Sequence, residues 1–170
     1  MVRVRAATAA QLALVLALAA GPAAAAETGR VALFDFNLVN TSLEPTRPDE
    51  TTRLGLMREV ATAEFAKRGV ALVDTAPVAA DAARVSSLHD CNGCELDLAR
   101  EVGAELAAVG WVQKVSNLIL NVNMQVREVG SGRLVRAGSV DIRGNTDDAW
   151  RRGVVYLFQR RLYPAPATPG

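Results

Sequence analysis

The sequence contains little histidine and little cysteine. Its 170 residues include 1 histidine, His89, and 2 cysteines, Cys91 and Cys94. Histidine is the side chain most often used in general acid–base catalysis, and a closed zinc site requires four ligands. The scarcity removes most histidine-based catalytic schemes, so we expect no catalytic residues. A zinc site would need a carboxylate such as Asp90 or Asp97 to complete it.

Phosphate-binding motifs are missing as well. The chain has neither a Gly-x-Gly-x-x-Gly nor a Gly-Lys-Ser/Thr pattern, so nucleotide binding has no support. Charge of one sign is not in excess either, because the formal net charge is +1 and both signs are mixed along the chain. A nucleic-acid partner requires a broad basic field. We therefore expect no cofactor and no nucleic-acid partner.

The N-terminus has the pattern of a cleaved secretory signal peptide. Arg3 and Arg5 form a short basic region, residues 6–20 are apolar, and Ala24-Ala25-Ala26 fits a small-residue cleavage site. The apolar run is short for a membrane span. We expect an exported, periplasmic protein without stable membrane insertion after cleavage. The expected division is a signal peptide at 1–26, a single α/β domain at 27–163 and a loose tail at 164–170.

A long period-two pattern lies in the middle of the chain. One side of the pattern is apolar and consists of Leu118, Leu120, Val122, Met124 and Val126. The other side is polar and consists of Asn117, Asn121, Asn123, Gln125 and Arg127. Such alternation predicts a strand with one covered and one solvent-facing side. Because amide side chains present donors and acceptors at strand spacing, the polar row is a candidate binding face for a peptide, a glycan or another subunit.

The remaining patterns predict a mixed α/β (α+β) fold. The expected strands are 30–36, 70–74, 104–114, the alternating strand, and a third meander strand that follows a turn at 130–132 and ends near Ile142. The expected helices are 49–68, 77–84, 94–102 and one capped by Asn145 or Thr146, with Trp150, Val154, Leu157, Phe158 and Leu162 as its apolar stripe. The predicted order is β-α-β-α-β-β-β-α, with a right-handed parallel crossover first, an antiparallel meander last, and helices packed on the sheet. We interpret Trp111 as a core residue.

The Cys91-Asn-Gly-Cys94 motif permits three interpretations. In an oxidising compartment, a structural disulfide is favoured. A redox pair is the second possibility, because a helix that begins at Cys94 stabilises a thiolate. Metal binding by His89, Cys91 and Cys94 is the third and is not favoured. His89 itself is expected to be an exposed loop residue.

Asp35, Asn37 and Asn40 lie at the carboxyl end of the first predicted strand. Ligands of open α/β sheets bind at that edge, so these residues form a possible strand-end site. They can equally well shape the turn that follows the strand.

Three segments resemble known periplasmic domains. Ala99-Arg-Glu-Val-Gly-Ala-Glu-Leu-Ala-Ala-Val-Gly-Trp-Val resembles the helix–glycine–strand step of the TolB amino-terminal domain and of CsgG-like curli-secretion proteins. Val31-Ala-Leu-Phe-Asp-Phe resembles their opening strand, and Val129-Gly-Ser-Gly-Arg-Leu-Val resembles their meander turn. With its Cys-x-x-Cys, the whole sequence is more similar still to exported proteobacterial proteins of unknown function. The resemblance implies a fold and a compartment, and no activity.

Two functions are consistent with these observations. The favoured one is a non-catalytic periplasmic binding or assembly accessory protein of the bacterial envelope, which binds an envelope or periplasmic protein. The alternative is a thiol–disulfide or metal-handling accessory protein that uses Cys91 and Cys94 and serves a periplasmic quinoprotein dehydrogenase system. The sequence does not predict an oligomeric state.

Overall fold

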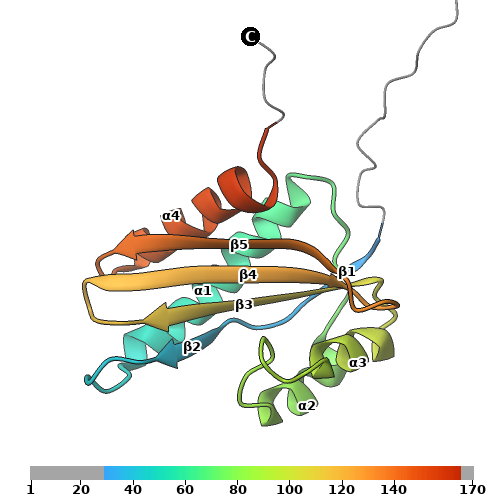
Figure 1. Cartoon of the computed structure of the whole chain (residues 1–170), viewed down its shortest axis with the longest axis horizontal. Helices are drawn as coiled ribbons and strands as arrows, with labels where there is room; N and C mark the ends of the chain where they lie inside the picture. Colours follow the sequence, from blue (N-terminus) through green and yellow to red (C-terminus); the bar gives the residue numbers. More distant parts are fainter. Residues whose placement is uncertain (1–28, 166–170) are drawn as a thin grey trace, which may run out of the picture.

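A five-stranded mixed sheet forms the centre of the fold (Figure 1). The computed structural model describes residues 29–165, so the expected signal peptide and most of the expected tail lie outside the described residues. The strands are β1 (Val31–Leu33), β2 (Asn37–Asn40), β3 (Leu106–Lys114), β4 (Ile119–Glu128) and β5 (Leu134–Arg143). The helices are α1 (Pro48–Ala66), α2 (Ala79–Arg84), α3 (Cys94–Glu101) and α4 (Asp147–Leu157), with a 3-10 turn at Ala76–Val78 and a π-helical turn at Phe158–Leu162.

The order of the strands confirms the predicted fold class. It is β1-β3-β4-β5, and β2 pairs with β3 beyond the end of β1. β1 and β2 are parallel to β3, whereas β4 and β5 continue the sheet as an antiparallel meander. The backbone of Leu72, which follows α1, pairs in parallel with Val31. The chain therefore has the predicted parallel crossover at its start and the predicted meander at its end.

Helices cover the two faces of the sheet unequally (Figure 1). α1 and α4 pack on one face, where they bury Leu120, Val122, Met124 and Val126 of β4. α2 and α3 pack on the other face near β1 and the start of β3, where a smaller core forms around Phe34, Ala107 and Val109. The second face is therefore covered at one corner, and the part formed by the first residues of β4 and their partners on β5 is open.

The last helix is confirmed as predicted. Its N-cap is Thr146, whose Oγ1 accepts a hydrogen bond from the backbone N–H of Ala149 at 3.2 Å. The predicted apolar stripe is buried: Trp150, Val154, Leu157, Phe158 and Leu162. Four arginines form the exposed side: Arg151, Arg152, Arg160 and Arg161.

Two predicted strands differ in the structure. The segment 70–74 forms a single bridge at Leu72. The first predicted strand is split into β1 and β2. Leu33 pairs with Ala108 of β3, and Asn37 pairs with Trp111. The chain has one more residue between Leu33 and Asn37 than β3 has between their two partners. The extra residue interrupts pairing on β3 at a position where Asp35 is exposed.

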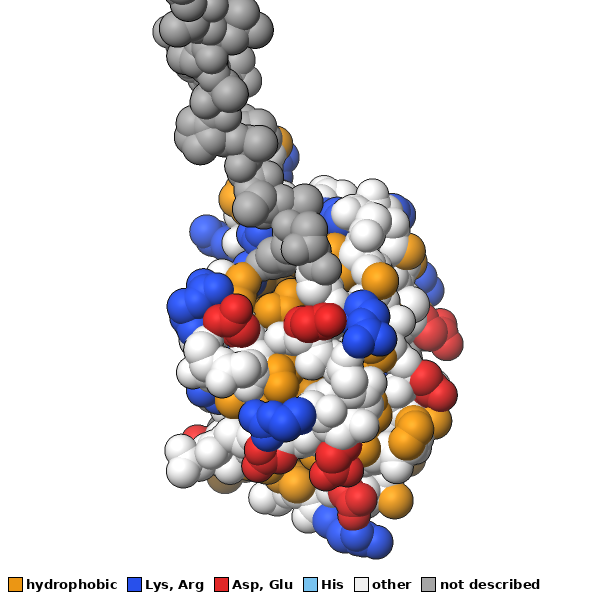
Figure 2. Space-filling view, turned by 90° about the vertical axis from the view of Figure 1, so that its right-hand side faces the viewer, with side chains coloured by type: hydrophobic (Ala, Val, Ile, Leu, Met, Phe, Trp, Pro, Cys, Tyr) orange, Lys and Arg blue, Asp and Glu red, His pale blue; other side chains and the backbone are white. Residues whose placement is uncertain are grey.

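The prediction that Leu118 lies on the buried side is wrong. Leu118 is 61% exposed, because it belongs to the β3–β4 turn and lies outside the paired strand. Within residues 29–165, no helix has the length and apolar character needed to cross a membrane. The face shown in Figure 2 carries acidic and basic side chains interspersed with apolar atoms, in keeping with the mixed charge of the sequence.

Candidate functional site

The polar side of β4 and β5 is organised by side-chain hydrogen bonds. Nδ2 of Asn121 donates to Oδ1 of Asp141 at 2.8 Å, and Oγ of Ser139 donates to Oδ1 of Asn121 at 2.9 Å. Nδ2 of Asn123 donates to the carbonyl oxygen of Asn121 at 3.2 Å. Asp141 and Ser139 are exposed and Asn121 is half-buried, whereas Asn123 is only 9% exposed. The structure therefore orders Asn121, Ser139 and Asp141 on an open surface.

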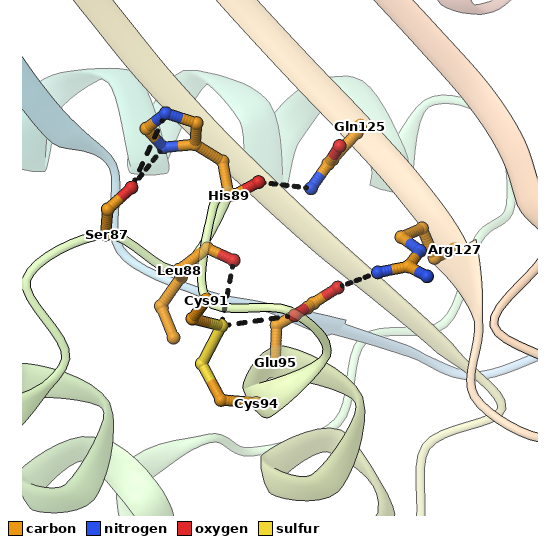
Figure 3. The surroundings of a disulfide bond; sticks show 8 residues. All are labelled: Ser87, Leu88, His89, Cys91, Cys94, Glu95, Gln125 and Arg127. Atoms are coloured by element: carbon orange, nitrogen blue, oxygen red, sulfur yellow. Dashed lines mark hydrogen bonds and ion pairs between the residues drawn. A yellow bond between two sulfur atoms is a disulfide. The ribbon is translucent and has the colours of Figure 1, made fainter.

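The other half of the predicted polar row is covered by α3 and the loop before it (Figure 3). Nη1 of Arg127 lies 2.6 Å from Oε1 of the buried Glu95 on α3. Nε2 of Gln125 donates to the carbonyl oxygen of His89 at 3.4 Å. Gln125 and Arg127 therefore attach the loop and helix to the sheet.

Asn117, the first residue of the predicted row, lies in the β3–β4 turn and not on the sheet face. Its Oδ1 accepts a hydrogen bond from Nδ2 of Asn145 at 3.1 Å. Oδ1 of Asn145 in turn accepts from Nε1 of Trp150 at 3.0 Å and from Nη1 of Arg53 at 3.2 Å. Asn117 is thus part of a polar network between the β3–β4 turn, α1 and α4.

A buried ion pair belongs to the same network. Nζ of Lys114 on β3 lies 2.7 Å from Oε1 of Glu50 on α1, and neither side chain is exposed. Oε2 of Glu50 accepts from the backbone N–H of Arg47 at 2.8 Å, and Asn145 donates to Oε1. Burial raises the pKa of Glu50, but the hydrogen bonds from Lys114, Arg47 and Asn145 outweigh it and hold this pKa below its usual value.

The sequence analysis missed this ion pair, although the pattern of β3 contained a signal for it. Leu106, Ala108 and Val112 alternate along β3 on the side covered by α1 and α4, and Lys114 continues that alternation. Period two therefore places Lys114 in the interior. A buried lysine requires a carboxylate partner, and helix α1 supplies Glu50.

Cys91 and Cys94 are joined by a disulfide that links the loop to the first residue of α3 (Figure 3). Sγ of Cys91 lies 3.4 Å from the carbonyl oxygen of Leu88 and 3.3 Å from Oε2 of Glu95. Asn92 and Gly93 between the cysteines both have positive φ, the conformation that asparagine and glycine tolerate best in tight turns.

His89 is half-buried, so the expectation of an exposed loop histidine is wrong. Its ring stacks on Trp111 of β3, with centroids 4.2 Å apart and an interplanar angle of 8°. Ser87 Oγ lies 2.8 Å from Nδ1. Burial lowers the pKa of His89, and the charge of Asp90 only partly opposes this shift. His89 therefore packs as a neutral aromatic ring against Trp111, which is itself only partly buried.

Within residues 29–165, the grouped metal-ligand candidates are Cys91, Cys94 and Glu95, whose ligand atoms lie within 4.8 Å of one another. The sequence-based set had His89 in the place of Glu95. Metal binding requires both thiolates, which here form the disulfide, and one carboxylate oxygen of Glu95 is already paired with Arg127. These three residues fit a structural disulfide beside an ion pair better than they fit a metal centre.

A pocket of about 270 Å³ lies at the carboxyl end of β1. Asp35 and Asn37 line it together with apolar side chains from α2 and the following loop. Oδ1 of Asp35 lies 2.8 Å from Nε of Arg58. Asn40 is not part of the pocket, because its amide donates to the carbonyl oxygen of Glu44 at 2.8 Å. The structure therefore brings Asp35 and Asn37 together and separates Asn40 from them.

Residues 29–162 match the model of a protein family, DUF3280, described as "Protein of unknown function (DUF2380)". No curated protein matches the sequence. The solved lipoprotein GNA1162 from Neisseria meningitidis is similar, with 11% identity and a TM-score of 0.51 over 69% of this chain and 82% of that chain. The LpoB C-terminal domain from Salmonella enterica has 16% identity and a TM-score of 0.49 over 68% and 82%. The likeness to GNA1162 shows a shared fold. The resemblance to TolB and CsgG-like domains stays a prediction.

Proposed function

The chain belongs to the DUF3280 family, and from its fold and site geometry we propose that it is a non-catalytic binding or assembly accessory protein of the bacterial envelope. The expected signal peptide at 1–26 supports a periplasmic location. The shared fold with a solved lipoprotein supports the same compartment. The partner is an envelope or periplasmic protein.

The observation that carries this proposal is the open half of the polar face. Asn121, Ser139 and Asp141 hold one another across β4 and β5, so their amide, hydroxyl and carboxylate groups have fixed positions. A partner that binds such groups loses less free energy to side-chain ordering than it would on a mobile loop. A rigid, polar and exposed sheet surface fits recognition of a folded polypeptide.

Electrostatics disfavour the alternative thiol–disulfide function. The carboxylate of Glu95 lies 3.3 Å from Sγ of Cys91, and a negative charge at that distance opposes formation of a thiolate. Arg127 pairs with the other carboxylate oxygen, Oε1, so Oε2 is the oxygen that faces Sγ of Cys91. We therefore propose that the disulfide is a structural staple, which holds α3 and the preceding loop on the covered half of the face.

A photo-crosslinking amino acid at the exposed Ala137 should capture one discrete partner in intact cells. Once this partner is purified, we expect the combined Asn121→Ala and Ser139→Ala substitutions to weaken its binding by about tenfold, because two hydrogen-bonding groups are lost. Isothermal titration calorimetry measures the change in affinity.

The matched control removes two polar groups on the opposite side of the molecule, where Thr62 and Gln159 are exposed. The combined Thr62→Ala and Gln159→Ala variant should bind as the unaltered protein does. Absence of a discrete adduct, or equal binding by both double variants, contradicts the proposal.

The Cys91→Ser and Cys94→Ser double variant should fold, with a free energy of unfolding lower by up to about 2 kcal/mol, because the closed ring is small. Amide hydrogen exchange should accelerate much more in residues 85–101 than in β3, β4 and β5, where it reports only the change in global stability. Chemical reduction of the unaltered protein should reproduce this pattern. A midpoint potential well above about −300 mV would favour a redox role and contradict the staple.

A further inference from the structure

Strand β5 ends the sheet with an outer edge that has no strand partner within residues 29–165. It is 10 residues long. Along such an edge, alternate residues direct their N–H and C=O groups outward, where another strand can pair with them. The bulge opposite Val126 and Arg127 lies near the start of β5, so residues 136–143 form a regular edge.

A groove of about 620 Å³ runs between this edge and α4. Val140, Ala149 and Gly153 contribute apolar or small surface to it. α4 approaches the strand closely there, since a Cβ on Gly153 would lie 2.7 Å from Cγ2 of Ile142. Tyr156 lines the groove and is 50% exposed, so its ring offers apolar area and a hydroxyl group to a bound segment.

The groove is predominantly basic. Arg143, Arg152 and Arg161 line it, and Arg152 pairs with Asp148. The guanidinium groups of Arg143 and Arg161 make no hydrogen bond or ion pair within the described part of the chain. The acidic lining residue, Asp141, has its Oδ1 engaged by Asn121. The groove therefore offers two uncompensated guanidinium groups, which bind carboxylates well.

From the unpaired edge and the basic lining together, we propose that β5 and α4 form a docking groove for an extended acidic segment of a partner protein. The segment adds to β5 as a further strand, and its carboxylates pair with Arg143 and Arg161. Backbone hydrogen bonds supply affinity in this mode, and side chains supply specificity. This inference rests on the proposed function, because it states the chemistry of one partner.

The test uses the mature full chain and a fluorescent peptide of about ten alternating Glu and Val residues, the length of a strand. Fluorescence anisotropy should show saturable binding. Charge reversal by Arg143→Glu with Arg161→Glu should weaken it by at least about tenfold, since two ion pairs become repulsions. The matched control, Arg151→Glu with Arg160→Glu, makes the same change in charge outside the groove and should change binding less than about twofold.

Amide hydrogen exchange with bound peptide should protect residues 136–143. Several results overturn the inference: equal loss in both charge-reversal variants, equal binding of the peptide with Lys in place of Glu, or equal binding of a proline-interrupted acidic peptide. Self-association of the unaltered protein also overturns the inference if the Arg143→Glu and Arg161→Glu double variant no longer self-associates. The occupant of the groove is then a second copy of the chain. If the acidic peptide fails while Ala137 still captures a partner, the inference fails and the proposed function stands.

Discussion

The Lys114→Met variant is expected to lose about 3 kcal/mol of unfolding free energy. The substitution keeps most of the length of the side chain and removes the cation that lies 2.7 Å from Glu50 Oε1. The carboxylate of Glu50 is fully buried and would then be without its charged partner. We expect this loss to lie at the low end of the range for broken buried ion pairs. The polar network around Glu50 reaches the surface through Arg53, which pairs with the exposed Asp147. Urea unfolding measures the loss.

A double-mutant cycle separates this coupling from a change in packing. The Glu50→Gln and Lys114→Met double variant should be more stable than the sum of the single losses predicts, by at least about 1 kcal/mol. Because the pKa of Glu50 is lowered on folding, the coupling is present above its ordinary value of 4.5 and is lost as the pH falls through the folded pKa. Additive losses at neutral pH contradict the ion pair.

Gly110→Ala should destabilise the protein by about 2 kcal/mol or more. A Cβ on Gly110 would lie 2.2 Å from Cε1 and 2.5 Å from Cζ of Phe36. The ring cannot move into solvent, because Phe36 is buried in the core between the sheet and α1. The split between β1 and β2 places Phe36 over the one β3 position that has no side chain. Thermal and urea unfolding both report the effect.

Gly55→Ala provides the matched control, because a Cβ at Gly55 of α1 meets nothing within 4 Å. This change should stabilise the protein by about 0.5–1 kcal/mol through helix propensity. Gly110→Ala combined with Phe36→Leu should recover part of the loss. Equal stability of Gly110→Ala and the unaltered protein would show that the ring is not confined.

The elements with strong periodic patterns could be predicted from the sequence. Met124 and Trp150 lie in such patterns, and both are buried where the patterns place them. Period-two and helical spacing determine which side chains a sheet or helix must bury, so the meander and α4 follow from local sequence. The cap at Thr146 followed from side-chain chemistry in the same way.

Features that depend on distant partners could not be predicted in this way. Leu72 makes only a single bridge to Val31. How many residues of 70–74 pair with β1 depends on the position of β1, which the sequence of that segment does not show. Asn117 continues the polar alternation, yet a turn takes it to Asn145. The covered half of the polar face follows from Glu95, whose pairing with Arg127 spans 32 residues of sequence. The sequence pattern of one strand contains none of this information.

The parallel pairing at the sheet edge has a consequence for the order of folding. The backbone N–H of Arg30, which precedes β1, donates to a carboxylate oxygen of Glu105, 75 residues later in the chain. β3, β4 and β5 pair through short connections and can assemble among themselves quickly, whereas closure of the long loop from β1 is slow. In a chain synthesised from its N-terminus, β1 therefore has no β3 to pair with until residues 106–114 have emerged.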